Sequence, residues 1–350
     1  MSGPTSKLYC HRAKVAVLVS AALVLGLAAG AYVFREAIFA GILDRQFRTE
    51  TSLLTDGHMH VILLGTGSPQ ADHARAKAGV AIFARGRMFL FDAGPGVVAS
   101  AENAKLPLSS LGAVFFTHYH SDHIGDFGQL LTESWLVGRK TPLGVYGPQG
   151  LLEVVGGFAR AFAPDAQYRS SHLGEELMPK SAAVPIPHEF GIGPDEQRPV
   201  LDKDGVKVIA FSVDHEPVLP AVGYRIEYGG HVVVLSGDTR KSDKVVQAAR
   251  GADLLIHEAL FGTQMVGELD RYYARRGQEQ QRVRLRLLRA YHSTPVEAAE
   301  VASRAGAKKL VLTHVAPLPN LFARSMYLRG AADAFAGPIT IGEDGMRFDL

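Results

Sequence analysis

One short segment of the chain crowds histidine and carboxylate side chains together. It reads Thr117-His118-Tyr119-His120-Ser121-Asp122-His123 and directly follows the apolar run 113–116, which is typical of a β-strand. Residues two apart in extended backbone point the same way, so His118 and His120 share one side, while Asp122 and His123 are placed to turn toward a second position. Imidazole and carboxylate together are the ligand set of zinc or a similar divalent ion. The segment therefore predicts a metal site.

Three further residues of the same chemistry follow later β-like runs. His215 follows the run 208–213, Asp238 follows 232–235, and His314 follows 310–313. Ligand sites of α/β proteins usually lie at the carboxyl ends of strands, so these side chains could converge with the first segment on one face. A polar loop of solvated histidines is the simpler alternative, but it does not account for this recurrence.

The elements that must position these residues alternate between strands and helices. Strands are expected at 60–64, 80–84, 88–92 and 113–117, followed by a helix over 126–136. A second series of strands is expected near 206–213, 221–228, 231–236, 253–257, 309–314 and 338–342, with helices at 242–249, 267–289 and 295–305. The alternation predicts an α/β fold of two similar halves. The stretch 164–204, rich in proline, serine and charge, is expected to be a loop.

Taken together, these motifs resemble those of a known family. His118-x-His120-x-Asp122-His123, with Leu63-Leu64-Gly65-Thr66-Gly67-Ser68-Pro69 upstream and Ser236-Gly237-Asp238-Thr239 downstream, resembles the metallo-β-lactamase superfamily. His257-Glu258-Ala259, His292-Ser293-Thr294 and Leu312-Thr313-His314 resemble more narrowly its ribonuclease Z and arylsulfatase-like branch. The resemblance covers about residues 58–350 and implies an α/β fold, a four-layered αββα sandwich with two Zn²⁺ or similar divalent ions.

The resemblance also implies a role for each ligand. One ion would be held by His118, His120 and His215, and the other by Asp122, His123 and His314, with Asp238 bridging them. A hydroxide between the ions would be the nucleophile, since metal binding lowers the pKa of water toward about 7. Asp122 would also orient that water or accept its proton.

A proton donor and a supporting carboxylate are expected beside these ligands. An ester leaving group departs more easily when protonated, so a general acid is needed near the metals. The resemblance assigns that role to His292; His257 is a second candidate, and Glu258 could hold either imidazole. His292 also fits a structural role, since Ser293-Thr294-Pro295 is typical of a helix start. Asp92 resembles the family's buried carboxylate that orients ligands, with a helix N-cap or turn as the alternative.

Three features bear on the substrate. Gly229-Gly230 joins two strand patterns and predicts a tight hairpin, where ribonuclease Z proteins insert a long tRNA-gripping arm. The segment 313–317 lacks the Arg-Tyr that usually follows this histidine in ribonuclease Z and is closer to the arylsulfatase-like pattern. The basic stretch from Arg271 to Arg289 could touch RNA or anionic lipid, but its interleaved leucines favour a half-buried helix with a solvated basic face.

Charge and cysteine content narrow the function further. The 350 residues hold 37 Lys+Arg and 35 Asp+Glu; residues 1–50 contain six of the cations and three of the anions, so residues 51–350 carry a net charge of −1. Such a body has no general electrostatic attraction for a phosphate backbone, which leaves open a local basic patch. The single cysteine, Cys10, precedes the body, which therefore has no disulfide framework and no thiolate ligands.

The N-terminal segment predicts a membrane anchor. Residues 15–34 are uncharged, apolar and long enough to cross a bilayer as a helix. Lys7, His11, Arg12 and Lys14 precede them, so the N-terminus is expected in the cytoplasm and the body outside it, in the periplasm. A signal peptide cleaved near residues 29–31 is the alternative, and the length of the run favours a retained anchor. The expected organisation is 1–14 cytoplasmic N-terminus, 15–37 transmembrane anchor or signal peptide, 38–56 linker, and 57–350 hydrolase domain.

The sequence as a whole predicts a membrane-anchored binuclear zinc hydrolase of phosphodiester or sulfate esters of small molecules. Nucleic acid is not expected as a partner, and a homodimer is left open. A ribonuclease Z-like tRNA 3′-processing endonuclease is the first alternative, and it would need an RNA grip. A lactonase or β-lactamase-type hydrolase would not be expected to show the motifs at 257–259 and 292–294. A catalytically inactive metal-binding module would usually have lost a ligand, and all seven expected positions are filled.

Overall fold

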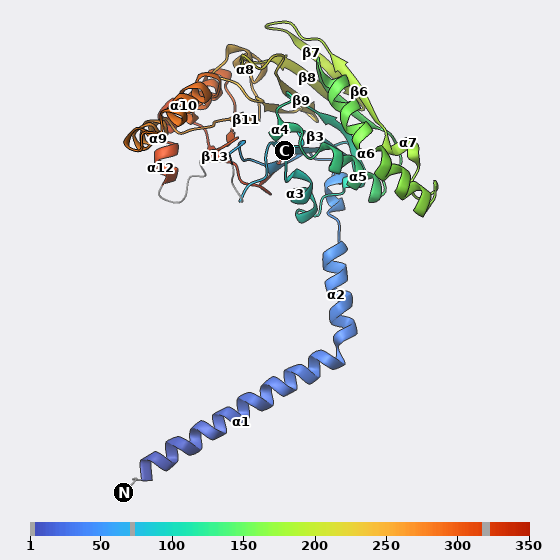
Figure 1. The fold of residues 1–350 in the computed structure, drawn as a ribbon, viewed down its shortest axis with the longest axis vertical. Coiled ribbons are helices and arrows are strands. Elements are labelled where there is room, and N and C mark those ends of the chain that lie inside the picture. Colours follow the sequence, from blue (N-terminus) through green and yellow to red (C-terminus); the bar gives the residue numbers. More distant parts are fainter. Residues whose placement is uncertain (1–3, 71–73, 317–322) are drawn as a thin grey trace. The chain divides into compact units, whose positions relative to one another are not determined.

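The structure, a computed structural model, describes residues 4–70, 74–316 and 323–350. It divides into a unit of residues 1–49 and a compact unit of residues 50–350. The first unit contains helices α1 (Pro4–Val33) and α2 (Arg35–Phe47) (Figure 1). Within α1, Val15–Val33 is apolar and long enough to cross a membrane, and none of this stretch is buried against other residues. The segment expected as a linker, 38–56, is helical as far as Phe47.

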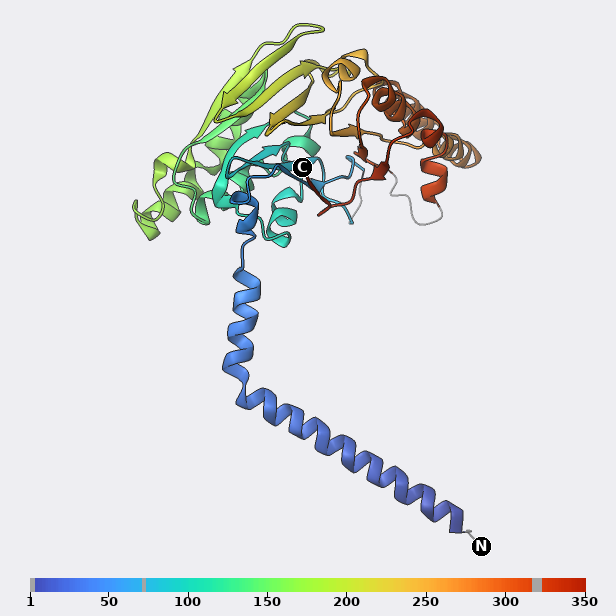
Figure 2. The ribbon, with the colours of Figure 1, turned by 180° about the vertical axis from the view of Figure 1, so that it is seen from behind.

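Two seven-stranded sheets form the centre of the compact unit (Figure 1 and Figure 2). The first has the order β14-β1-β2-β3-β4-β5-β6, with bounds Arg347–Asp349, His60–Gly65, Gly79–Ala84, Arg87–Phe91, Leu111–Phe115, Leu143–Pro148 and Pro185–Phe190. The second has the order β13-β12-β11-β10-β9-β8-β7, with bounds Ile339–Ile341, Leu310–Thr313, Leu254–Glu258, His231–Leu235, Val222–Tyr228, Val206–Ser212 and Gln197–Lys203. In both sheets, one half is antiparallel and the other half is parallel.

The two sheets pack face to face, and helices cover their outer faces. One apolar core lies between the sheets and takes alternate residues of both, such as Phe91, Phe115, Val208 and Ile256. The opposite face of the first sheet packs against α3 (Val97–Asn103), α5 (Phe127–Leu136) and α6 (Leu151–Leu173). The opposite face of the second packs against α8 (Asp243–Ala248), α11 (Pro295–Ala305) and α13 (Ala331–Ala334). The observed architecture is thus an α/β fold of two sheets with flanking helices.

Most of the strands and helices expected from the sequence are present, but the expected loop over 164–204 is wrong. That stretch contains the second half of α6, the short helix α7 (Lys180–Ala183) and the edge strands β6 and β7. Pro164 removes one backbone donor inside α6, which costs a helix about 3 kcal/mol. Packing of α6 on α5 and the first sheet outweighs that cost; for example, the Phe162 ring fills the space beside Gly128 of α5.

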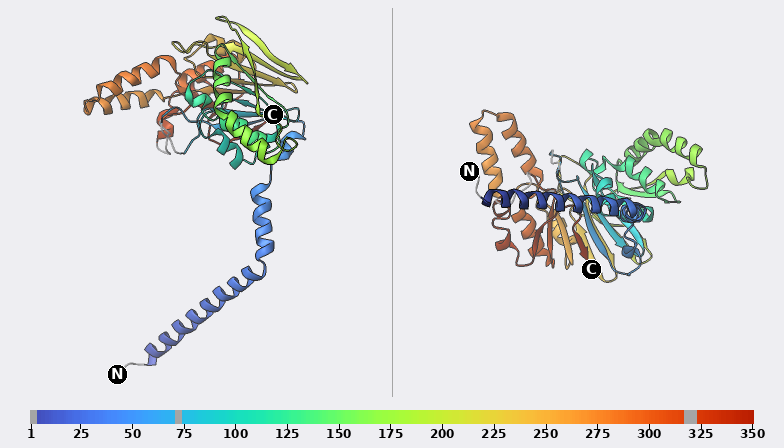
Figure 3. Two further views of the ribbon diagram at one scale, coloured as in Figure 1. Left: turned by 45° about the vertical axis from the view of Figure 1, so that its right-hand side comes forward. Right: turned by 90° about the horizontal axis from the view of Figure 1, so that it is seen from below.

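A second departure concerns the helix expected over 267–289. The structure contains two helices there, α9 (Thr263–Arg275) and α10 (Glu279–Tyr291). Gly277 lies between them with φ of 64°, a left-handed conformation that side-chain-bearing residues rarely adopt. The two helices form a hairpin, which projects from the sheets in Figure 3.

Aromatic rings between the sheets support the strand that leads into the histidine-rich segment. Phe115, at the end of β4, is fully buried and stacks on Phe91 and Tyr146 with ring centroids 4.8 and 4.9 Å apart. We expect Phe115→Ala to lower the free energy of unfolding by about 3–5 kcal/mol, because it removes this packing and leaves a cavity. Urea denaturation of the full-length chain measures the change. Leu152→Ala, on the exposed side of α6, should change stability little; an equal loss in both variants would contradict the account.

Candidate metal centre

The histidine and carboxylate side chains singled out in the sequence meet where strands of both sheets end. The segment 117–123 follows β4, His215 follows β8, Asp238 follows β10, and His314 follows β12. Strands β8, β10, β11 and β12 all run in the same direction, because β8 and β10 are each antiparallel to β9 while β10, β11 and β12 are parallel. Their carboxyl ends therefore share one edge of the second sheet.

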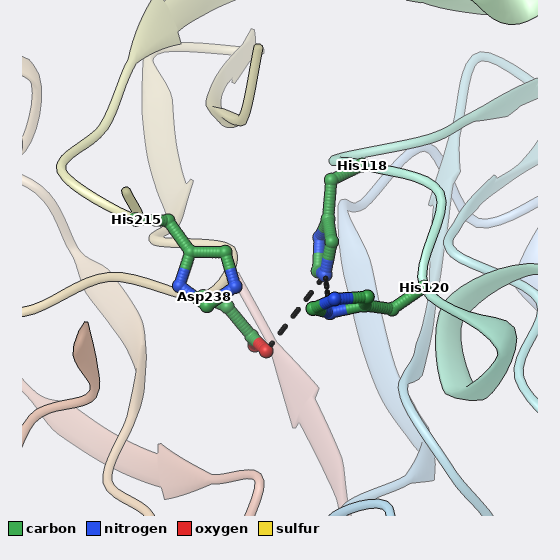
Figure 4. A group of neighbouring side chains, drawn as sticks. All are labelled: His118, His120, His215 and Asp238. Carbon is green, nitrogen blue, oxygen red and sulfur yellow. Dashed lines mark hydrogen bonds and ion pairs between the residues drawn. The ribbon is translucent and has the colours of Figure 1, made fainter. Parts of the chain in front are cut away.

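A first group of four side chains contains His118, His120, His215 and Asp238 (Figure 4). Their candidate ligand atoms lie within 4.8 Å of one another. His118 and His120 come from the segment after β4, and Figure 4 shows them facing His215 and Asp238 from the second sheet. Nε2 of His118 lies 2.9 Å from Nδ1 of His120 and 3.9 Å from Oδ2 of Asp238.

A second group contains Asp122, His123 and His314 and adjoins the first through Asp238. Oδ2 of Asp238 lies 3.4 Å from Nε2 of His123 and 3.3 Å from Nε2 of His314. The same nitrogen of His314 lies 3.2 Å from Oδ2 of Asp122. One carboxylate thus touches both groups, and all seven expected ligand residues come together.

The two groups are suited to a divalent cation. Nε2 of His123 and Nε2 of His215 are buried and form no hydrogen bond within the described part of the chain, although the rings lie among carboxylates and imidazoles. Burial lowers the pKa of His118, His120 and His215, so these imidazoles favour the neutral form that binds metal. With only nitrogen and oxygen donors, the groups match the ligands of zinc and similar ions.

The carboxylates around His123 also favour a bound cation. Burial alone would lower the pKa of His123, but the carboxylates of Asp238 and Asp92 outweigh it and raise the pKa well above its usual range. The pKa of Asp238 is held well below its usual range, since His314 and His123 outweigh the effect of burial. This part of the site attracts positive charge, which a metal ion supplies in place of a proton.

Asp92 contacts one of the ligand residues and lies in a left-handed backbone conformation, with φ of 60°. Its Oδ2 lies 2.8 Å from Nδ1 of His123, and its two oxygens accept hydrogen bonds from the backbone N–H and hydroxyl of Thr117. The residue at the start of α3 is Gly96, so the alternative of a helix N-cap does not hold. His215 is oriented by a group that the sequence did not indicate, the backbone carbonyl of Tyr291, 3.2 Å from its Nδ1.

The two candidate proton donors differ in where they lie. Nδ1 of His292 lies 2.9 Å from Oε1 of Glu258, and the His292 ring stacks on His314 with centroids 5.2 Å apart. Burial opposes the charged form of His292, but Glu258 outweighs it and raises the pKa of this imidazole. His257 pairs in register with Leu312, which belongs to the helix-facing core, so it lies on the face of β11 opposite to Glu258. The structure therefore brings His292 and Glu258 to the site and leaves His257 outside it.

Glu258 also fixes the loops around the site. Its Oε1 accepts hydrogen bonds from the backbone N–H groups of Thr239 and Ser293, each 3.1 Å away. One carboxylate oxygen thus ties the residue after Asp238 to the residue after His292. Sequence reasoning missed Thr239 and Ser293 as supports, because a backbone donor leaves no signal in residue type.

Two features of the backbone also shape the site: a close approach between Gly94 and Asp122, and the left-handed conformation of His314. A Cβ on Gly94 would lie 2.0 Å from the backbone oxygen of Asp122, so only glycine fits there. His314 itself has φ of 58°, a conformation that is uncommon outside glycine and is typical of functional sites.

We expect Asp238→Asn to weaken binding of divalent metal more than about 100-fold, because this carboxylate is the one that touches both groups. Metal retained after dialysis against a weak chelator, measured by mass spectrometry, checks this. Asp243→Asn is the matched control, since Asp243 is exposed at the start of α8 and lies outside both groups. Retention of metal by Asp238→Asn at the level of the control would contradict the assignment.

The chain matches known proteins over most of its length. Residues 87–315 match the family model described as a Beta-lactamase superfamily domain. The chain is 37% identical over 295 residues to a ribonuclease Z of Mycobacterium bovis (strain BCG / Pasteur 1173P2), covering 83% of this chain and 98% of that protein. It is 35% identical over 289 residues to a ribonuclease Z of Mycolicibacterium paratuberculosis (strain ATCC BAA-968 / K-10), covering 82% and 96%.

Solved structures share the fold. The metallo-beta-lactamase fold protein YhfI from Bacillus subtilis superposes with a TM-score of 0.58 at 23% identity, covering 84% of this chain and 100% of that chain. The short form of human tRNase Z (ELAC1) superposes with a TM-score of 0.58 at 24% identity, covering 83% and 98%.

The M. bovis relative resembles this chain in having no long insertion between the strands β9 and β10. The alignment with the M. bovis protein spans 295 positions, and 83% of this 350-residue chain is about 290 residues. Nearly every aligned position is thus filled by a residue of this chain. The relative therefore has no long inserted segment where this chain has Gly229-Gly230.

Proposed function

The chain belongs to the beta-lactamase superfamily and is related to ribonuclease Z, and on this premise we propose that it is a metal-dependent ribonuclease. It would cleave a phosphodiester bond of RNA, as in the removal of a 3′ extension from tRNA. The observation that carries the proposal is the 37% identity to proteins named ribonuclease Z over 98% of their length. The site supports it, because the metal groups and the pair of His292 and Glu258 are all present.

The expectation of a small-molecule substrate with no nucleic acid partner is wrong, because the mycobacterial relatives are ribonucleases by name. Two arguments behind that expectation also fail. The lack of a long arm does not exclude ribonuclease activity, since the M. bovis relative has no long insertion there either. The net charge of −1 is an average over a body whose positive charge is unevenly placed, since residues 263–291 contain seven arginines and three acidic residues.

We further propose that two divalent ions are bound, and zinc fits the ligand set best. His118, His120 and His215 would hold one ion, Asp122, His123 and His314 the other, with Asp238 between them. The position of the Asp238 carboxylate between the two groups supports this. Such ions supply activated water and neutralise charge on the phosphate oxygens. The metal analysis described above tests the number: two zinc ions per unsubstituted chain are expected, and one would contradict it.

The residues of the chain itself supply the proton transfers. Nδ1 of His292 donates to Glu258, which fixes the ring and leaves Nε2 as the nitrogen that can carry a proton to the leaving oxygen. Asp122, held by Nε2 of His314, would orient the attacking water or accept its proton. His257 has no part in this scheme, because it lies on the other face of β11.

We expect His292→Ala to lower kcat for RNA by about 10²–10⁴-fold, since a ribose oxygen departs poorly without a proton. The same substitution should affect bis(p-nitrophenyl) phosphate far less, because p-nitrophenolate leaves without protonation. Steady-state kinetics on the two substrates measures the contrast. His231→Ala, at the half-buried first residue of β10 and outside both metal groups, is the control. Equal losses on both substrates would show that His292 is not the proton donor.

We also propose that Val15–Val33 anchors the chain in a membrane with its N-terminus in the cytoplasm. The apolar composition of α1, the exposure of this stretch and the basic residues before it support the proposal. The ribonuclease would then meet RNA outside the cytoplasm.

The topology predicts that a phosphatase reporter fused after Leu350, active only outside the cytoplasm, is active in cells and remains with the membrane fraction. Deletion of residues 15–33 should release the reporter from the membrane and abolish its activity. Activity of a reporter that works only in the cytoplasm would contradict the topology while leaving the ribonuclease proposal unaffected.

A further inference from the structure

The hairpin of α9 and α10 flanks a cavity of about 430 Å³. Its apolar floor includes Phe261, Leu285 and Leu288, and its polar rim includes Tyr273, Gln281 and Arg284. The volume falls within the range of pockets that hold small organic groups, roughly 300–1,000 Å³. None of these side chains belongs to the metal groups, so the scheme above leaves the cavity without a role.

The hairpin concentrates the positive charge of the body. Residues 263–291 contain seven arginines and three acidic residues, whereas the rest of 51–350 contains 24 cations and 29 anions. Four of the seven arginines form ion pairs with carboxylates, namely Arg271, Arg282, Arg286 and Arg289. Arg284 forms no ion pair with any residue that the structure describes, and it lies exposed on the rim of the cavity.

The cavity and the metal centre are built from the same two segments, helix α10 and the residues that follow Glu258. Helix α10 ends at Tyr291, whose carbonyl orients His215, and His292 follows directly. Arg284 lies eight residues before His292, which is about 12 Å along the helix. On the other side, Phe261 follows Glu258 by three residues, and the preceding Leu260 bonds to the carbonyl of Ser293.

We propose that this cavity binds one unpaired nucleotide of the RNA substrate close to the scissile phosphate, an inference that rests on the proposed ribonuclease function. The base would stack on Tyr273 over the apolar floor, and Arg284 would contact a neighbouring phosphate. An aromatic ring with a free arginine and an amide beside it matches the way proteins hold unpaired bases. A positively charged hairpin on a body of opposite net charge directs a polyanion to this edge.

Binding of a fluorescent single-stranded RNA, with a non-hydrolysable linkage at the cleavage site, to the zinc-loaded full-length chain in detergent tests the cavity. We expect Arg284→Ala and Tyr273→Leu each to raise Kd at least about fivefold. Arg286→Ala is the matched control, because it removes the same charge from the same helix at a residue that does not line the cavity. It should change Kd less than twofold. An RNA with one abasic nucleotide near the cleavage site should bind the unsubstituted chain more weakly than the intact RNA does. The Tyr273→Leu variant should bind the two RNAs equally well.

Equal effects of Arg284→Ala and Arg286→Ala would overturn the proposal, since binding would then reflect general charge. Val283 and Leu287 are exposed on α10, so sedimentation with vesicles of anionic lipid is measured in parallel. Loss of vesicle binding in Arg284→Ala with unchanged RNA binding would also overturn it, in favour of a membrane surface. A separate measurement of RNA cleavage in the presence of zinc distinguishes failure of the ribonuclease proposal from failure of the cavity proposal. RNA bound through the cavity but not cleaved contradicts the ribonuclease function, and RNA cleaved without dependence on Arg284 and Tyr273 contradicts the cavity.

Discussion

The fold must compensate for the free energy lost when ionisable side chains are buried at the ends of the strands. Asp238 is almost fully buried, with four imidazoles within 4.0 Å of its Oδ2, and Asp122 and Asp92 lie among the same rings. Charges removed from water in this way destabilise a fold unless opposite charge and hydrogen bonds compensate them. A divalent cation held by these groups would meet that requirement. The close glycine at 94 and the left-handed backbone of His314 follow from it, since the ligands must converge from separate strands.

Much of the centre could be predicted from the sequence because its ligands follow strands. An apolar run that ends in His or Asp places a polar side chain at the end of a strand, and strands of one direction present those ends at one edge. That Glu258 faces the site while His257 faces away could also have been predicted, because neighbouring residues on a strand face opposite sides. The carbonyl of Tyr291 could not, since every residue carries a carbonyl and only the fold decides which one reaches His215.

The errors in the predicted fold have local causes. Strands β6 and β7 lie at the edges of their sheets, where exposed polar residues and prolines are tolerated, so they lack the apolar signal of central strands. The hairpin of α9 and α10 shows the limit of whole-body averages. The sequence shows the basic stretch, but its interleaved leucines favour a solvated helix face. The local surplus of four positive charges over residues 263–291, beside the metal centre, bears on an RNA substrate more directly than the net charge of −1.

The central claim is that this metal centre cleaves RNA. The most direct test is to compare kcat/KM of the purified full-length chain for a tRNA precursor carrying a 3′ extension and for bis(p-nitrophenyl) phosphate, each before and after removal and restoration of zinc. The account predicts cleavage of the precursor at one position near its 3′ end, lost with the metal, regained with zinc, and more efficient than hydrolysis of the small diester. Zinc-dependent hydrolysis of the small diester with no cleavage of RNA would contradict it.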